Sequence, residues 1–240
     1  MRAPFYESVD VTLYHGDWRA ALGISGDVII ADPPYGDTAL EWDRWPSMWP
    51  MQAAPLAPQM WCFGSFRSLV GHWSEFAPWR FAQEIVWQKH NGSNFLADRF
   101  RRVHELVAHF YQGPWADLHI EPVTTPDATA RTIRRKKHPP HMGRIEEGHY
   151  TSEDGGPRLQ RSVIRVRSCH GHAQNETQKP EGIVEPLIEY SCPRGGVVLS
   201  LFAGSGTDLV VARSLGRRAI GFEVREEQCE VAARRLEATA

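Results

Sequence analysis

Short runs of apolar residues, each bounded by polar or turn-forming residues, recur along the chain. The clearest cover residues 28–31, 197–199 and 219–222. Runs of this length between turn signals are typical of strands that are buried on both faces of a sheet. The pattern predicts seven strands, near residues 11–15, 27–31, 60–64, 82–88, 104–111, 196–201 and 218–223.

Helical segments are predicted between most of these strands. Residues 208–213 have helical character, and Gly216 is a typical helix end. The last residues form an amphipathic helical pattern. Alternating strands and helices predict an α/β fold of three layers, with a seven-stranded, mostly parallel sheet, helices on both faces and one reversed hairpin at the edge.

The second predicted strand runs directly into Asp32-Pro33-Pro34-Tyr35. Ligands of open α/β sheets bind outside the carboxyl ends of the strands. An exocyclic amine is a poor nucleophile because its lone pair is delocalised into the ring. An Asp32 oxygen and the Pro33 carbonyl can accept both amino hydrogens and free that lone pair, while Tyr35 stacks on the base. Each proline fixes its own φ and restricts the residue before it, which holds the acceptors in place. The motif indicates methylation of a planar amino group; a turn that only closes the strand is the alternative.

A second motif follows the strand predicted at 196–201. It consists of a glycine loop at 202–207, a helix, and a strand that ends in Glu223. This order is that of a nucleotide-binding half-fold, in which the acid binds ribose hydroxyls. Leu209 stands where the dinucleotide fingerprint has its third glycine, so a pyrophosphate cofactor fits poorly. S-adenosylmethionine has no phosphate and is the predicted cofactor; a purely structural glycine turn is the alternative.

Together, these motifs resemble the DNA amino-methyltransferases that modify adenine N6 or cytosine N4. The tetrapeptide precedes the Phe-x-Gly-x-Gly loop, which is similar to the permuted, beta-type subgroup. The resemblance covers residues 11–35, 84–111 and 177–236. It implies a Rossmann-like, S-adenosylmethionine-dependent methyltransferase fold and a site-specific DNA methyltransferase. A target inside a duplex must then be flipped out to reach the pocket.

The resemblance also implies roles for individual residues. The catalytic loop would be Asp32, Pro33, Pro34 and Tyr35. The residues expected at the cofactor include Asp32 and Asp17, of which Asp17 would meet its adenine amino group. Gln178, Lys179 and Pro180 would close over it, and Glu223 would bind its ribose. The residues expected around its methionine part are Phe202, Ala203, Gly204, Ser205, Gly206 and Thr207. Asp as the first catalytic residue favours adenine N6, with cytosine N4 as the alternative.

The sequence departs from the family pattern at Ser200-Leu201, where the family commonly has Asp-Pro. Two other functional classes stay open. Protein glutamine and RNA methyltransferases also use such a tetrapeptide, but they usually place the glycine loop first. A non-catalytic DNA-binding relative is the other possibility, against which the intact Asp32 argues.

Positive charge is concentrated in one segment. Residues 131–172 hold ten Lys or Arg and four Asp or Glu, a local charge of +6 in a chain whose net charge is −2. A basic face on an otherwise acidic protein indicates a polyanion, here double-stranded DNA; a solvated charged loop is the alternative. We expect one methyltransferase domain over 1–240, with 113–175 as a basic insertion for target recognition. The candidate DNA-binding residues are Arg134, Arg135, Lys136, Lys137, Arg165 and Arg167.

The remaining features are less informative. No apolar stretch approaches the ~20 residues of a membrane span, and the four scattered cysteines favour free thiols in the cytoplasm. We expect no metal site, because Cys169-His170-Gly171-His172, even with His138, His141 and His149, matches no common zinc module. A homodimer is possible. Trp42, Trp45 and Trp49 have near-helical spacing, which predicts a helix packed on the sheet or, alternatively, rings that flank a flipped base.

Overall fold

The computed structural model describes residues 3–21, 23–93, 97–135, 148–169, 171, 173–174 and 177–239, with only the backbone described at Ser93 and Arg135. The chain divides into two compact units. The larger unit comprises Met1–Glu121 and Ser162–Ala240, and the smaller comprises Pro122–Arg161.

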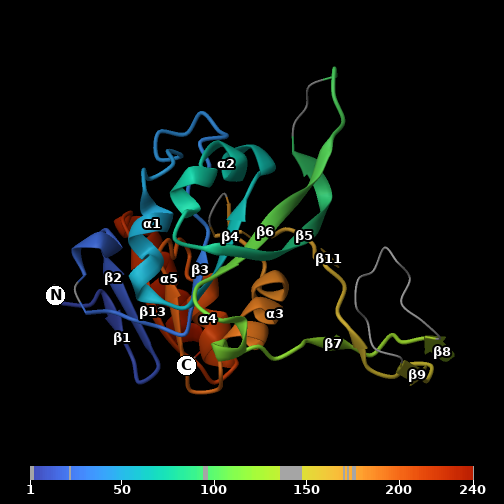
Figure 1. Ribbon diagram of the computed structural model, residues 1–240. Helices are drawn as coiled ribbons and strands as arrows, with labels where there is room; N and C mark the ends of the chain where they lie inside the picture. The colour runs from blue at the N-terminus through green and yellow to red at the C-terminus, as the bar shows by residue number, and fades with distance from the viewer. Residues whose placement is uncertain are drawn as a thin grey trace. The chain divides into compact units, whose positions relative to one another are not determined.

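In the described part of the larger unit, one sheet contains nine strands (Figure 1). Their order is β1 (Tyr6–Glu7), β2 (Val11–His15), β13 (Arg218–Glu223), β12 (Val197–Ser200), β3 (Val28–Ala31), β4 (Gln59–Gly64), β6 (Arg102–Tyr111), β5 (Arg80–Ser93) and β11 (Val163–Arg165). All seven strands predicted from the sequence are present, but the count of seven is too low. The two additional strands, β1 and β11, are edge strands of two and three residues, which are too short to produce an apolar run.

The central strands β2, β13, β12, β3 and β4 are parallel to one another. Strand β6 is antiparallel to both β4 and β5, so β5 and β6 form the expected reversed hairpin. The hairpin does not lie at the sheet edge, because β11 pairs with β5 in parallel. At the opposite edge, β1 is antiparallel to β2.

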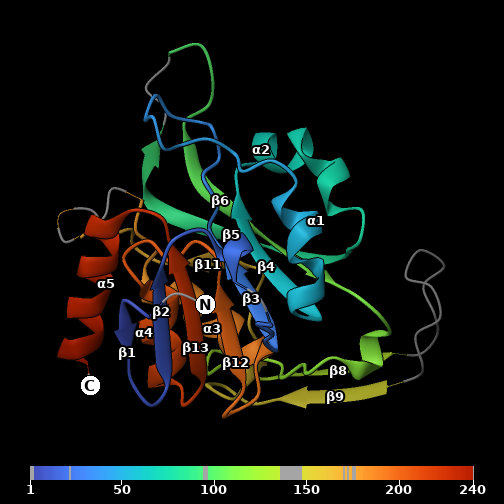
Figure 2. The same ribbon diagram turned by 90° about the vertical axis from the view of Figure 1, so that its left-hand side faces the viewer.

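Helices cover both faces of this sheet and complete three layers (Figure 2). One face carries α3 (Glu181–Ser191), α4 (Thr207–Ser214) and α5 (Glu226–Ala238). The other face carries α1 (Trp49–Ala53) and α2 (Phe66–Gly71). Four 3-10 turns complete the helical elements of the described residues: η1 (Trp18–Ala20), η2 (Ala54–Leu56), η3 (Trp73–Phe76) and η4 (Trp115–Asp117).

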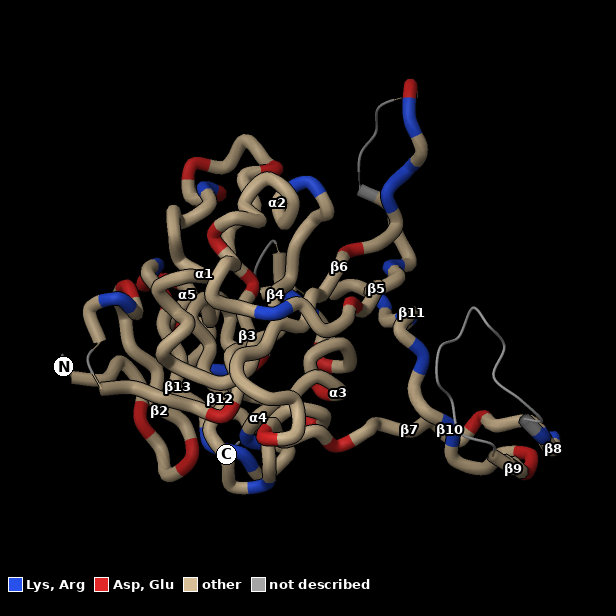
Figure 3. The backbone as a smooth tube through the Cα atoms, viewed as in Figure 1, with Lys and Arg blue, Asp and Glu red and all other residues tan. Residues whose placement is uncertain are grey.

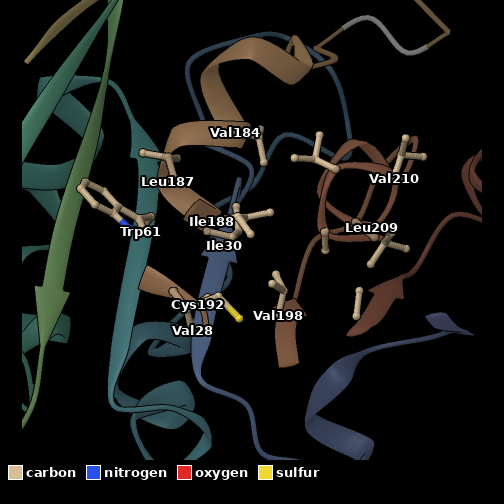
Figure 4. Packing of buried hydrophobic residues seen from close by; sticks show 14 of the residues in the cluster. Val28, Ile30, Trp61, Val184, Leu187, Ile188, Cys192, Val198, Leu209 and Val210 are labelled. Atoms are coloured by element: carbon tan, nitrogen blue, oxygen red, sulfur yellow. The ribbon is translucent and has the colours of Figure 1, made fainter. Parts of the chain in front are cut away.

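The central strands are mostly apolar because both of their faces are covered. Alternate side chains of a strand point to opposite faces. Val28 and Ile30 pack with residues of α3 and α4 such as Leu187 and Leu209 (Figure 4). Ile29 packs in a second cluster, together with Trp49 of α1. The sheet is therefore the middle layer between two hydrophobic cores.

The helix predicted through Trp42, Trp45 and Trp49 is present only from Trp49 onward. Met48, immediately before it, has a φ of 61°, which lies in the left-handed region and ends any continuous helix. The segment before α1 is instead held by Asp43, whose carboxylate accepts hydrogen bonds from the backbone N–H groups of Gly36 and Thr38. Of the three tryptophans only Trp49 is fully buried in the core, and Trp45 packs against the same cluster.

The smaller unit consists of short antiparallel pairs. Strand β8 (Arg131–Arg135) pairs with β9 (Gly148–Ser152), and β7 (Thr124–Thr125) pairs with β10 (Arg158–Leu159). Among the described residues of this unit, Ala128 is the one buried apolar side chain. The unit is narrower than the insertion expected at 113–175, because β11 and the residues after it belong to the larger unit.

Three further findings concern the part of the chain that the structure describes. Among the described residues, no helix is long and apolar enough to cross a membrane. All four cysteines are free thiols, and three of them are buried. In the same residues no group of three His, Cys, Asp or Glu side chains could hold a metal ion, and His138, His141, His170 and His172 lie outside the described residues.

Candidate active site

The two sequence motifs lie next to each other at one edge of the sheet. Asp32 directly follows β3, and the glycine loop follows β12, which is the parallel neighbour of β3. Neighbouring parallel strands end at the same edge, so the two loops meet although they come from opposite ends of the sequence. The order of the strands in the sheet, not their order along the chain, therefore forms the site.

A cavity of about 860 Å³ lies at this edge, within the larger unit. This volume falls in the range of pockets that hold a cofactor or a small substrate, roughly 300–1,000 Å³. Thirteen of the candidate catalytic and cofactor residues line it: Asp17, Asp32, Pro33, Pro34, Tyr35, Gln178, Lys179, Phe202, Ala203, Gly204, Ser205, Thr207 and Glu223. Pro180 and Gly206 do not line it. Pro180 is the N-cap of α3, and Gly206 is the N-cap of α4.

Asp32 lies in a network of buried charged groups. The Tyr35 hydroxyl donates to Asp32 Oδ1 at 2.8 Å, and the Lys179 ammonium contacts the same oxygen at 2.7 Å. Lys179 Nζ also lies 3.4 Å from Glu105 Oε2. Burial raises the pKa of Asp32, and the Lys179 ammonium opposes that rise. Lys179 therefore holds the candidate catalytic carboxylate of Asp32 as well as lining the cavity.

Glu105 is a member of this network that the sequence pattern assigned to a purely structural strand. It forms ion pairs with Lys179 and with Lys89, which lies on the neighbouring strand β5. Burial alone would raise its pKa, but the two ammonium groups outweigh burial and lower it to about 2. Glu105 is thus a fixed negative charge beneath the catalytic loop. The signals in the sequence were Glu105, directly before the apolar run 106–108, and Lys89, shortly after the apolar run 85–87.

The glycine loop is fixed by Glu223, at the end of β13. Glu223 Oε2 accepts a hydrogen bond from the Gly204 N–H at 2.8 Å, and Oε1 accepts one from the Arg225 N–H at 2.9 Å. Gly206 has a φ of +77°, and a Cβ there would lie 2.8 Å from the Ala232 Cβ of α5. Only glycine allows the loop to pass this close to α5. The residues of the loop that line the cavity and the Glu223 side chain are therefore held in a fixed arrangement.

Further aromatic and acidic side chains are also part of the wall. Asp17 follows β2 and caps η1 by accepting a hydrogen bond from the Arg19 N–H. Trp42 also lines the cavity, with the Arg225 guanidinium 4.5 Å from its ring centroid. From the spacing of the tryptophans, Trp42 was expected either in a helix packed on the sheet or beside a flipped base. In the structure, Trp42 lines the cavity and lies outside any helix.

The candidate DNA-binding residues that the structure describes do not line the cavity. Arg165 on β11 and Arg167 just after it are exposed, and both line a small pocket together with His90. Figure 3 marks the Lys and Arg positions along this segment in blue. Arg134 is exposed on β8 of the smaller unit. The side chain of Arg135 and all of Lys136 and Lys137 lie outside the described residues.

Comparison with known protein families shows to which family the chain with these site residues belongs. A family model described as DNA methylase, for enzymes that modify N6 or N4 amino groups, matches residues 26–234. The chain belongs to this N6/N4 DNA methylase family. It is accordingly a DNA amino-methyltransferase, and the matched region includes both the Asp32 loop and the glycine loop.

Similar proteins include two type II methyltransferases over nearly the whole chain. Methyltransferase M2.DpnII of Streptococcus pneumoniae is 29% identical over 99% of this chain and 94% of its own length. Methyltransferase M.ScaI of Streptomyces caespitosus is 27% identical over 99% of this chain and 84% of its own length. The chain therefore aligns over most of the length of both methyltransferases.

Solved structures of DNA methyltransferases share the fold. The M1.HpyAVI complex with S-adenosylmethionine has a TM-score of 0.62 at 20% identity, over 94% of this chain and 99% of that one. The cytosine-N4-specific PvuII methyltransferase has a TM-score of 0.62 at 14% identity, over 96% of this chain and 87% of that one. At sequence identities this low, the comparison with solved structures supports the fold alone. A cytosine-N4-specific enzyme shares that fold.

Proposed function

We propose that this DNA methylase is site-specific and transfers a methyl group to the exocyclic N6 of an adenine flipped out of double-stranded DNA. The observation that carries the proposal is the position of Asp32-Pro33-Pro34-Tyr35 beside the glycine loop, in one cavity. The family match favours DNA over protein glutamine or RNA as substrate. The Asp at the first position of the tetrapeptide favours adenine over cytosine.

The residues of the catalytic loop suit activation of an amine. An Asp32 oxygen and the Pro33 carbonyl would accept the two amino hydrogens, which localises the nitrogen lone pair for attack. Pro33 and Pro34 fix the backbone of the loop, so positioning precedes binding. The Tyr35 ring would stack on the flipped base, while its hydroxyl keeps the Asp32 carboxylate in place. The methylated amine loses its proton readily, so no strong general base is required.

The cofactor is S-adenosylmethionine, which supplies the electrophilic methyl group when it is bound. The cavity suits this molecule because its walls offer complementary groups at separate points. Glu223 presents a carboxylate suited to ribose hydroxyls, and Asp17 presents one suited to the adenine amino group. Gly204, whose amide is fixed by Glu223, allows close approach of the methionine part. The pairing of β12 with β3 then brings methyl donor and amine together.

The methylated atom can be determined directly. We expect product DNA, digested to nucleosides and analysed by mass spectrometry, to contain N6-methyladenine. The same digest reports N4-methylcytosine, and a product with only that base would assign the enzyme to cytosine. A protein that binds DNA but transfers no methyl group would instead be a non-catalytic relative.

The DNA surface is proposed to include basic residues of both units. In the larger unit, Arg165 is exposed on an edge strand of the sheet that bears the cavity, and Arg167 is exposed just after that strand. In the smaller unit, Arg134 is exposed, and the sequence places Arg135, Lys136 and Lys137 directly after it. Lys and Arg side chains that contact phosphates release counterions, which makes binding dependent on salt.

Replacing Arg165 and Arg167 together by alanine is expected to weaken binding to DNA and to reduce its salt dependence. Removing one phosphate interaction lowers the slope of log K against log salt by about 0.9. Fluorescence anisotropy at several salt concentrations measures both the affinity and the slope. Arg194→Ala and Arg218→Ala, which remove exposed charges from the larger unit away from the cavity, serve as controls. An unchanged slope in the Arg165/Arg167 variant would remove these residues from the DNA surface. Loss of preference at one base pair would identify a base reader instead of a phosphate contact.

A further inference from the structure

A buried acid at the start of α4 has no role in the reaction as described so far. Asp208 is 6% exposed and lines the cavity next to the glycine loop. Its Oδ2 accepts a hydrogen bond from the Ser200 hydroxyl at 2.8 Å. Within the described residues, that is its one side-chain hydrogen bond, and no cation pairs with it. Oδ1 is thus left for a group that enters the cavity.

The cations nearest to Asp208 are engaged elsewhere. Lys179 pairs with Asp32 and Glu105. Arg235 of α5 donates to the Ser205 carbonyl and the Thr207 hydroxyl, and it pairs with Glu181. Each interacts with Asp208 only over a longer distance. The acid therefore lies at the cavity wall without an ion-pair partner among the described residues.

This arrangement is unfavourable in the free protein. Burial raises the pKa of Asp208 to about 7; the Ser200 hydrogen bond opposes the rise, and the nearby Asp32 adds to it. A folded-state pKa above the unfolded value favours the fold most at low pH, and this contribution is lost as the pH rises through about 7. A positively charged ligand would offset this cost. Binding of such a ligand therefore explains the presence of an acid that destabilises the free protein at neutral pH.

We propose that Asp208 binds the α-ammonium group at the methionine end of S-adenosylmethionine, with the Ser200 hydroxyl orienting its carboxylate. The inference rests on the proposed cofactor, and it names a binding residue that the sequence motifs do not include. The glycine loop proposed for the methionine part leads directly into Asp208. An ammonium group brings three donors and a positive charge, which the free Oδ1 and the unpaired carboxylate can satisfy.

The proposal also accounts for Ser200, where the family commonly has Asp. Ser200 and Asp208 are in contact. One carboxylate is therefore present at this point whether the acid stands at position 208 and the hydroxyl at position 200, or the reverse. From the sequence, Ser200→Asp would restore the family residue and leave affinity unchanged or improved. The structure leads to the opposite expectation. That substitution brings two buried carboxylates together, and we expect it to lower both the melting temperature and the affinity for the cofactor.

The test is calorimetric titration of Asp208→Asn with three ligands. S-adenosylmethionine and S-adenosylhomocysteine both carry the α-ammonium, whereas 5′-methylthioadenosine lacks the amino-acid end. We expect the first two to bind roughly ten- to a hundredfold more weakly than to the unmodified protein, as for loss of a hydrogen bond to a charged group. The affinity for 5′-methylthioadenosine should not change. Equal losses for all three ligands, or none, would overturn the assignment.

The pH dependence adds a measurement that a structural role would not affect. The ammonium binds the ionised carboxylate, so below about pH 7 a proton must leave Asp208 before binding. Affinity of the unmodified protein for S-adenosylhomocysteine should therefore rise between about pH 6 and about pH 8, and this rise should disappear in Asp208→Asn. A rise that persists in the variant would contradict the proposal.

The double exchange Ser200→Asp with Asp208→Ser completes the test. It keeps one acid and one hydroxyl in contact, and we expect affinity for S-adenosylhomocysteine to return to within a few-fold of the unmodified protein. If the exchange does not restore binding in a folded protein, the carboxylate at 208 is not equivalent to one at 200, and that part of the proposal is wrong. If the unmodified protein binds none of the three ligands, the proposed cofactor fails instead.

Discussion

Asp32→Ala is expected to lower the rate of methyl transfer by two to three orders of magnitude or more. The substitution removes an acceptor whose interaction with the amino group strengthens as the nitrogen becomes tetrahedral, and deleting one such group typically has this effect. DNA binding should persist, because the proposed phosphate contacts lie outside the cavity. Single-turnover transfer of labelled methyl groups, at saturating DNA and cofactor, measures the chemical step.

Glu41→Ala is the matched control for this experiment. Glu41 is an exposed acid a few residues along the same segment, and it does not line the cavity. It should transfer methyl groups at the normal rate. Turnover by Asp32→Ala within a few-fold of the unmodified protein would show that the amine is activated by other residues. An intact melting temperature is required of both variants, since Asp32 also contacts Lys179.

Lys179→Met is expected to impair both stability and activity. The side chain is 7% exposed and lies between Asp32 and Glu105. Removing the shared cation leaves the Asp32 carboxylate without its ion-pair partner, whereas Glu105 keeps Lys89. Loss of one partner of a buried ion pair typically lowers the free energy of unfolding by about 3–5 kcal/mol. Methionine fills a similar volume, so the change mainly removes charge. Urea denaturation at neutral pH measures the loss.

The pH profile separates the effect on Asp32 from the effect on stability. Burial raises the pKa of Asp32 and Lys179 opposes the rise, so the pKa should increase further when the ammonium is removed. The ionised carboxylate is the acceptor, so activity falls as the pH drops through that pKa. The acid limb of kcat/KM should therefore move to higher pH in Lys179→Met.

Lys89→Met provides the control for this shift. Lys89 pairs with Glu105 but makes no contact with Asp32, so its loss should reduce stability and leave the acid limb nearly in place. A shift of equal size in both variants would mean that Lys179 acts on the reaction through general electrostatics. No shift in Lys179→Met would show that Asp32 does not set the acid limb.

The positions of the central strands were predictable because burial on both faces requires an uninterrupted apolar run. Residues 28–31 and 218–223 are examples, and the predicted bounds differ from the observed strands by one residue or less. The edge strands β1 and β11 were not predictable. Their pairing depends on a neighbouring strand that is already in place, and their few residues carry no periodic signal.

The conformation around Trp42 was also not predictable from the sequence pattern, which indicated a helix. Tryptophans at helical spacing suggest one apolar face, but Asp43 binds the backbone of Gly36 and Thr38 and turns the chain away from a helix. The conformation of this segment is decided by contacts between residues that lie several positions apart in the sequence. As a result, Trp42 lies at the cavity and Trp49 in the core.

The sequence by itself determined the chemistry of the two loops, because each motif is local: a rigid acidic turn after one strand and a glycine turn after another. The tertiary structure alone decided which distant residues complete them. Parallel pairing of β12 with β3 brings the loops together, and the β5–β6 hairpin brings Lys89 and Glu105 beneath Asp32. Helix α4 places Asp208 against Ser200. Such contacts depend on strand order and side-chain direction, which hydrophobic periodicity does not encode.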